Sequence, residues 1–95
     1  MQALTFPQKL IAVIRAIDSD RRVWLYGDGN NGKTYVLSSP LISAMLKDKG
    51  YRCWYGDIFP DSPRIIVHAN EPPPENLPDD FVHIHFTGHY VNGVY

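Results

Sequence analysis

The chain has 95 residues, of which 44% are hydrophobic and 20% are charged, and its formal net charge is −1. This size and composition indicate one soluble globular domain, and they exclude a disordered chain and a membrane-spanning one, because no apolar run approaches the length that a bilayer requires. The near-neutral charge excludes nucleic-acid binding by bulk charge. The lone Cys53 excludes an internal disulfide and favours a reducing, intracellular location without an export signal.

The first predicted element is a helix that begins near Thr5. Residues 5–8, Thr-Phe-Pro-Gln, match a capping box in which the threonine and glutamine side chains satisfy backbone amides of the first turn. Apolar residues then recur at helical spacing as far as Ile17, and the polar residues 18–20 end the pattern. The next five residues, 22–26, read Arg-Val-Trp-Leu-Tyr. This run predicts a strand that is buried on both faces.

A second helical pattern begins at Lys33, runs to about Lys49 and is closed by Gly50. Pro40 interrupts it. Either one helix kinks at this proline, or Ser38 or Ser39 caps a second helix that has Pro40 in its first position. Both interpretations remain open on the sequence.

Three further strands are expected in the second half of the chain. Residues 52–55 form a short one, residues 65–69 a buried one, and residues 81–86 alternate between apolar side chains and histidines. Residues 71–78 include four prolines and must form a loop. The acidic pair Asp79-Asp80 is interpreted as a solvated turn.

Residues 27–34, Gly-Asp-Gly-Asn-Asn-Gly-Lys-Thr, match the phosphate-binding pattern G-x-x-x-x-G-K-[ST]. Its glycines allow positive φ, so that successive amides can point at phosphate oxygens above the start of the following helix. A Gly/Asn-rich hairpin turn is the alternative. The order strand, loop, helix favours the phosphate loop. The residues expected to bind nucleotide are Gly27, Gly29, Asn30, Asn31, Gly32, Lys33 and Thr34.

Within this loop, Lys33 is expected to contact the β- and γ-phosphates of ATP, and the Thr34 hydroxyl to hold Mg²⁺. Asn70 ends the buried strand 65–69. An asparagine in this position can orient the attacking water or sense the γ-phosphate through its amide. The sensor role requires strand 65–69 to lie directly beside residues 23–26 and parallel to them, at the carboxyl ends where open α/β sheets bind ligands. The alternative for Asn70 is a side chain that caps the turn into Pro72.

These stretches together resemble the helicase segment of the replication initiator (Rep) proteins of small circular single-stranded DNA viruses, a branch of the superfamily 3 helicases, with nanovirus-like members nearest. The resemblance rests on "DSDRRVWLYG", on the Walker A-like "GDGNNGKT", on "RIIVHANEPPP", which is similar to motif C, and on "ENLPDDFVHIHF". It covers most of the chain. It implies ATP and Mg²⁺ as cofactors, leaves single-stranded nucleic acid as a candidate partner, and implies action in the host nucleus.

The chain departs from the family in three ways. No strand ending in Walker B acids is evident, and the substitute is Asp57, which is expected to join Thr34 at the metal; its alternative is an ordinary loop acid. Phe81 stands where the family has an arginine. The nuclease domain that precedes this segment in full-length Rep proteins has no counterpart here. Only about twenty residues separate Gly50 from Asn70, too few for the usual pair of parallel strands joined by a crossover helix.

The sequence therefore predicts a single α/β domain over residues 1–95, similar to a small P-loop NTPase. A leading helix and turn occupy residues 1–22, and the nucleotide-binding core, residues 23–95, holds a mostly parallel sheet of three or four strands with flanking helices. The expected function is ATP hydrolysis coupled to nucleic-acid unwinding in replication, with Lys33, Asn70 and Asp57 as catalytic residues. The alternative is a non-enzymatic, truncated Rep-like module that binds nucleotide or a full-length Rep protein and regulates it. We expect a homo-oligomer or a complex with Rep, and no membrane association.

A small basic–aromatic patch is a second candidate for contact with single strands. Its members share the region just after the second helical pattern: Lys47, Lys49, Tyr51, Arg52, Trp54 and Tyr55. The alternative for these aromatic residues is core filling at the end of a helix.

Overall fold

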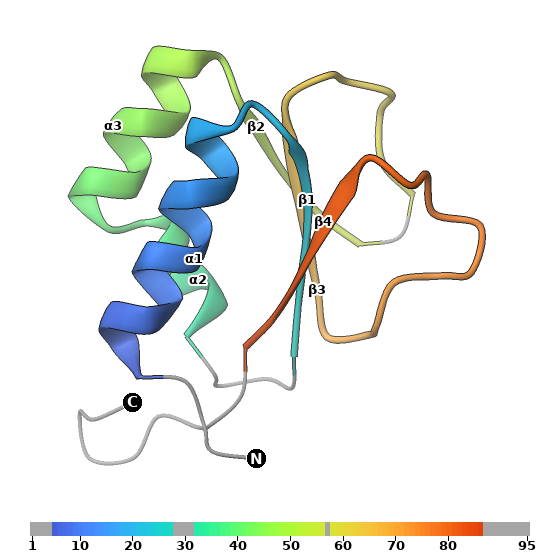
Figure 1. Ribbon diagram of the computed structural model, residues 1–95, viewed down its shortest axis with the longest axis horizontal. Coiled ribbons are helices and arrows are strands. Elements are labelled where there is room, and N and C mark those ends of the chain that lie inside the picture. The colour runs from blue at the N-terminus through green and yellow to red at the C-terminus, as the bar shows by residue number, and fades with distance from the viewer. Residues whose placement is uncertain (1–4, 28–31, 57, 87–95) are drawn as a thin grey trace.

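The computed structural model describes residues 5–27, 32–56 and 58–86. Three helices and four strands follow in the order α1 (Phe6–Asp18), β1 (Arg22–Tyr26), α2 (Lys33–Leu37), α3 (Pro40–Lys49), β2 (Arg52–Tyr55), β3 (Ile65–Ala69) and β4 (Phe81–His85) (Figure 1). None of these helices is both long enough and apolar enough to cross a membrane.

The four strands form one parallel sheet in the order β2-β3-β1-β4. The loop strand β1 is central: Val23 aligns with Ile66 of β3 on one side and with Val82 of β4 on the other. This confirms the predicted α/β domain with a parallel sheet and flanking helices. It also confirms that β3 lies directly beside β1. In a parallel sheet all carboxyl ends meet at one edge, which is where open α/β sheets bind ligands.

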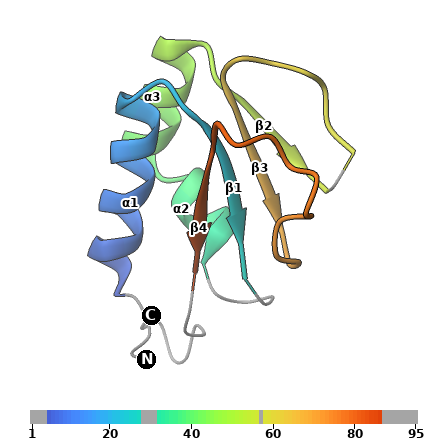
Figure 2. The same cartoon turned by 45° about the vertical axis from the view of Figure 1, so that its right-hand side comes forward.

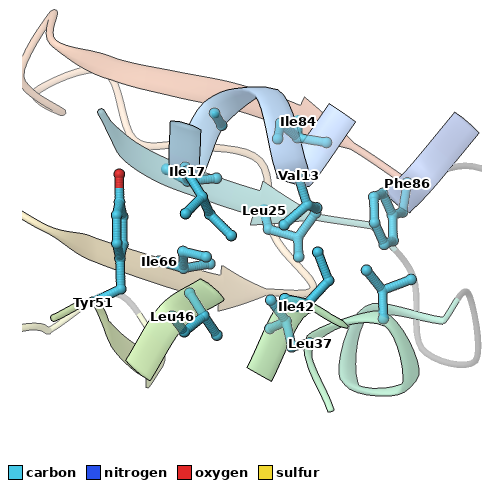
Figure 3. Close-up of a cluster of buried hydrophobic side chains, with 13 residues drawn as sticks. Val13, Ile17, Leu25, Leu37, Ile42, Leu46, Tyr51, Ile66, Ile84 and Phe86 are labelled. Carbon is cyan, nitrogen blue, oxygen red and sulfur yellow. The ribbon is translucent and has the colours of Figure 1, made fainter. Parts of the chain in front are cut away.

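All three helices lie on one face of the sheet (Figures 1 and 2). Because side chains alternate along a strand, Val23, Leu25 and Ile66 point towards the helices. They pack there against fully buried Val13 and Ile17 of α1 and against Ile42 and Leu46 of α3 (Figure 3). This cluster is the main hydrophobic core, and it fixes β1 and therefore the start of the loop.

The opposite face is covered by loops instead of helices (Figure 2). Trp24, Val67 and Phe81 form a second buried cluster there, and Phe59 and Leu77 of the connecting loops pack against it. The Phe59 ring meets Trp24 and Phe81 edge-on, with centroids 6.1 and 5.5 Å apart. The proline-rich loop before β4 thus contributes to the core.

Local signals account for the helix boundaries. Thr5 and Gln8 form the predicted capping box, with the Gln8 amide 3.3 Å from the Thr5 hydroxyl and the Thr5 amide 2.8 Å from Gln8 Oε1. At Pro40 the chain starts a new helix, so the two-helix alternative is correct. The Ser39 hydroxyl donates to the Val36 carbonyl at 2.7 Å, satisfying a carbonyl at the end of α2. Gly50 ends α3 with φ of 73°.

The connection between β2 and β3 differs from the expectation. These strands are adjacent and parallel, yet only residues 56–64 join them, and the described part of this segment contains no helix. The usual crossover helix is unnecessary because Phe59 packs against the far-face cluster and shields that side of the sheet. Strand β2, which the sequence predicts at residues 52–55, therefore precedes β3 in the chain. The sequence shows no clear Walker B strand at this position.

Candidate functional site

The two residues that flank the middle of the glycine-rich loop, Gly27 and Gly32, are both described by the structure. Gly27 follows β1 directly and is buried. Gly32 has φ of 92°, in the left-handed region that glycine adopts without strain, and it precedes the first residue of α2, Lys33. The three intervening residues expected to contact phosphate, Gly29, Asn30 and Asn31, lie outside the described residues.

Lys33 joins the two ends of this loop. Its side chain is 8% exposed, and Nζ donates a hydrogen bond to the carbonyl oxygen of Gly27 at 2.8 Å. A buried ammonium is costly unless it is hydrogen-bonded, and the Gly27 carbonyl supplies such a bond. The Lys33 side chain thus connects the start of α2 to the residue at which the loop leaves β1.

Thr34, the expected Mg²⁺ ligand, is the second residue of α2 and is exposed. A threonine hydroxyl offers one oxygen to a metal, so the remaining ligands must come from elsewhere. The expected partner, Asp57, lies outside the described residues. Among the residues that the structure does describe, no group of three or more His, Cys, Asp or Glu side chains is suited to a metal ion.

Asn70 follows the last residue of β3 and is exposed at the carboxyl edge of the sheet, one strand away from the glycine-rich loop. It lines a pocket of about 280 Å³. The other lining residues come from β1, the ends of β2 and β3 and the loop after β3: Trp24, Tyr55, Gly56, Ala69, Glu71, Pro72 and Pro74. The structure thus places Asn70 beside the loop strand, as motif C would require, and its role as a water or phosphate sensor stays a prediction.

Strand β2 ends at the same edge. The Gly56 amide donates to the His68 carbonyl at 3.2 Å, which extends the β2–β3 ladder one residue beyond Tyr55. The chain then leaves the sheet at the residue before Asp57. In the sequence, Asp57 follows Gly56 directly.

His68 is a site neighbour that the sequence reasoning did not assign. It aligns with Leu25 in the sheet, which puts it on the helix-covered face, and the Tyr55 ring lies edge-on to it at 5.4 Å. Half-burial lowers the pKa of His68 below its usual 6.5, and the positive charge of Lys33 lowers it further. The imidazole is therefore neutral at pH 7 and close enough to Lys33 to respond to a bound anion. The sequence signal for this role was the presence of a histidine inside the otherwise apolar strand β3.

Comparison of the sequence with models of known protein families gives no match, and comparisons with curated proteins and with solved structures give none either.

The basic–aromatic patch is only partly present as one surface. Tyr51 is buried and donates its hydroxyl to the Arg21 carbonyl at 2.7 Å, so for this residue the core-filling alternative is correct. Lys49 binds the Asp20 carboxylate at 2.8 Å and the Ile17 carbonyl at 3.2 Å. These two side chains hold α3 and the turn before β1 in place and are occupied there.

The remaining members of the patch, Lys47, Arg52, Trp54 and Tyr55, are exposed.

The pair Asp79-Asp80 lies in an exposed turn before β4, as the sequence predicts. Asp80 accepts two hydrogen bonds from the Arg22 guanidinium, at 2.7 and 2.6 Å, and this partner lowers the pKa of Asp80. Within this exposed turn, Asp80 is therefore also the partner of a structural ion pair. The guanidinium also lies over the Phe81 ring, 4.4 Å from its centroid. These contacts lie at the amino ends of β1 and β4, at the opposite edge from the glycine-rich loop.

Proposed function

We propose that this chain is an ATP-binding P-loop domain of the kind found in the superfamily 3 helicase segment of viral Rep proteins. In such a domain ATP hydrolysis is coupled to unwinding of nucleic acid during replication, in the nucleus of a host cell. The observation that carries the proposal is the contact between Lys33 Nζ and the Gly27 carbonyl at 2.8 Å, because it places a buried cation between the two ends of a loop whose sequence fits a phosphate-binding motif.

The roles follow from the chemistry of each group. Backbone amides of residues 27–32 and the Lys33 ammonium would bind the β- and γ-phosphates, since both are hydrogen-bond donors suited to a compact anion. The Thr34 hydroxyl and Asp57 would hold Mg²⁺, which when bound neutralises charge that develops on the phosphates. Asn70 would orient water through its amide. The Lys33 ammonium exchanges the Gly27 carbonyl for a phosphate oxygen when ATP enters.

A second candidate is a regulatory module that binds nucleotide and joins a ring of its own copies or of full-length Rep. The exposed edge strand β2 favours it. Within the described part of the chain β2 pairs only with β3, all four of its residues are exposed, and Trp54, Tyr55 and Ile58 are 42%, 60% and 86% exposed. Size-exclusion chromatography with light scattering, with and without ATP and Mg²⁺, tests this candidate.

Isothermal titration calorimetry with ATP and Mg²⁺ tests the proposed function. We expect the wild-type chain to bind and Lys33→Ala to lose binding, because the substitution removes the cation at the phosphates. The matched control is Lys47→Ala, which removes an exposed lysine of α3 and should leave the affinity unchanged. Far-ultraviolet circular dichroism shows that each variant is folded. Equal ATP affinities for Lys33→Ala and Lys47→Ala would contradict the proposal.

A further inference from the structure

Strand β2 forms one edge of the sheet, and its main-chain hydrogen bonds show which of its groups face outward. The amides of Arg52 and Gly56 donate to carbonyls of the neighbouring segment that contains β3, at 3.0 and 3.2 Å. In a parallel ladder, every second residue of a strand bonds to a given neighbour. The N–H and C=O groups of Cys53 and Tyr55 therefore point away from β3, at the open edge.

The same edge carries exposed apolar side chains. Trp54 and Tyr55 of β2 are exposed, and so is Ile58, whose carbonyl accepts a hydrogen bond from Trp54 Nε1 at 2.8 Å. The other edge strand, β4, differs, because its exposed side chains are His83 and His85. An edge strand with open main-chain groups and exposed apolar side chains is a template for pairing with a further strand.

We propose that β2 pairs with β2 of a second copy of this chain, antiparallel and across a two-fold axis at Trp54. In this register Cys53 of each copy lies opposite Tyr55 of the other, and each such pair exchanges both of its main-chain hydrogen bonds. The two Trp54 residues lie opposite each other in the non-hydrogen-bonded position, where cross-strand side chains are closest. The contact uses the same surface on both copies, so it closes at a dimer.

The residues around β2 select this register and this partner. A pair centred one residue earlier would need the outward amide of Tyr51, which already donates to the Leu46 carbonyl at 2.9 Å. With the axis at Trp54, Arg52 of one copy lies opposite Gly56 of the other, so no like charges face each other across the pair. Each outward donor of one copy thus meets an acceptor of the other, and each exposed indole is covered by its counterpart.

Sedimentation equilibrium tests whether the chain forms this dimer. Strands of 4 residues bury a small interface, so we expect a dissociation constant between about 10 µM and about 1 mM, with and without ATP, because the pairing uses no nucleotide-binding group. Trp54→Lys should weaken the dimer at least about tenfold, because it removes the apolar pair and places like charges directly opposite each other. The matched control is Leu41→Lys, which changes a residue that is 56% exposed on α3 and should leave the association unchanged.

Disulfide trapping tests the register. In a Cys53→Ser background, Trp54→Cys should cross-link two copies, because the register places the two Cα atoms about 4.5 Å apart, within disulfide range. Arg52→Cys in the same background should not, because the two copies of that residue lie about 14 Å apart along the strands. Circular dichroism shows that each variant is folded. The proposal is overturned by equal cross-linking of these two variants, by a wild type that stays monomeric up to about 1 mM or forms assemblies larger than a dimer, or by Trp54→Lys dimerising like wild type.

Discussion

Replacing Trp24 with phenylalanine tests whether the proline-rich loop before β4 is part of the folded core. The substitution removes the 3.1 Å hydrogen bond to the Glu71 carbonyl and part of a side chain that is 1% exposed. A net hydrogen bond contributes about 1 kcal/mol, and the lost ring atoms correspond to one or two buried methylene groups at about 0.8 kcal/mol each. The free energy of unfolding should therefore fall by about 2 kcal/mol, which corresponds to roughly 10 °C in Tm for a domain of this size.

Trp54 supplies the matched control for this experiment. Its Nε1 also donates to a loop carbonyl, that of Ile58 at 2.8 Å, but its side chain is 42% exposed. Trp54→Phe should therefore cost at most about 0.5 kcal/mol, as surface substitutions usually do. Urea denaturation followed by circular dichroism at 25 °C measures both variants. Equal losses for Trp24→Phe and Trp54→Phe would refute the assignment of the far-face loops to the core.

Three further outcomes are expected. Because the folded-state pKa of His68 lies below its usual 6.5, the free energy of unfolding should fall as the pH drops below 6.5, and His68→Gln should make this pH dependence less steep. ATP bound at Lys33 should raise the His68 pKa, which an NMR titration of the imidazole ring measures. A His68 pKa that ATP leaves unchanged would contradict the proximity of His68 to Lys33. Arg22 lowers the pKa of Asp80, so this ion pair stabilises the fold above pH 3.8 and loses that effect as the pH falls further. Asp80→Asn should therefore make the Tm less dependent on pH on the acid side of a Tm–pH curve. A curve that the substitution leaves unaltered would argue against the ion pair. Gly50→Ala should cost about 1 kcal/mol in urea denaturation, because φ is 73° there while a Cβ meets no atom within 4 Å; no loss would argue against the left-handed cap.

Local patterns were sufficient for the helix boundaries and the interior strands. The Thr5 capping box, the apolar run of β1 and the apolar run of β3 each specify their structure through neighbouring residues. The adjacency of β1 and β3 also followed from the sequence, because a γ-phosphate sensor at Asn70 needs its strand beside the loop strand. The assignment of Pro40 stayed open, because a kinked helix and a new helix share the same apolar spacing.

Contacts between distant segments were not predictable in the same way. The pairing of Arg22 with Asp80 joins residues 58 positions apart, and no pattern among the residues next to either one predicts the pair. The crossover from β2 to β3 was unexpected because its shielding depends on Phe59, a single aromatic residue within a proline-containing loop. The same holds for the pocket beside Asn70, which exists only once β1, β2 and β3 are assembled.

The central claim is that phosphate binds at the loop closed by Lys33, and a ¹H–¹⁵N NMR titration with ATP and Mg²⁺ tests it most directly. We expect the largest shift changes at the amides of Gly27, Gly32, Lys33 and Thr34, with smaller changes at Asn70. Tripolyphosphate should reproduce the changes at the loop, since the phosphates carry the interaction. Shift changes that map to the opposite edge, around Arg22, or a spectrum that ATP leaves unchanged would contradict the claim.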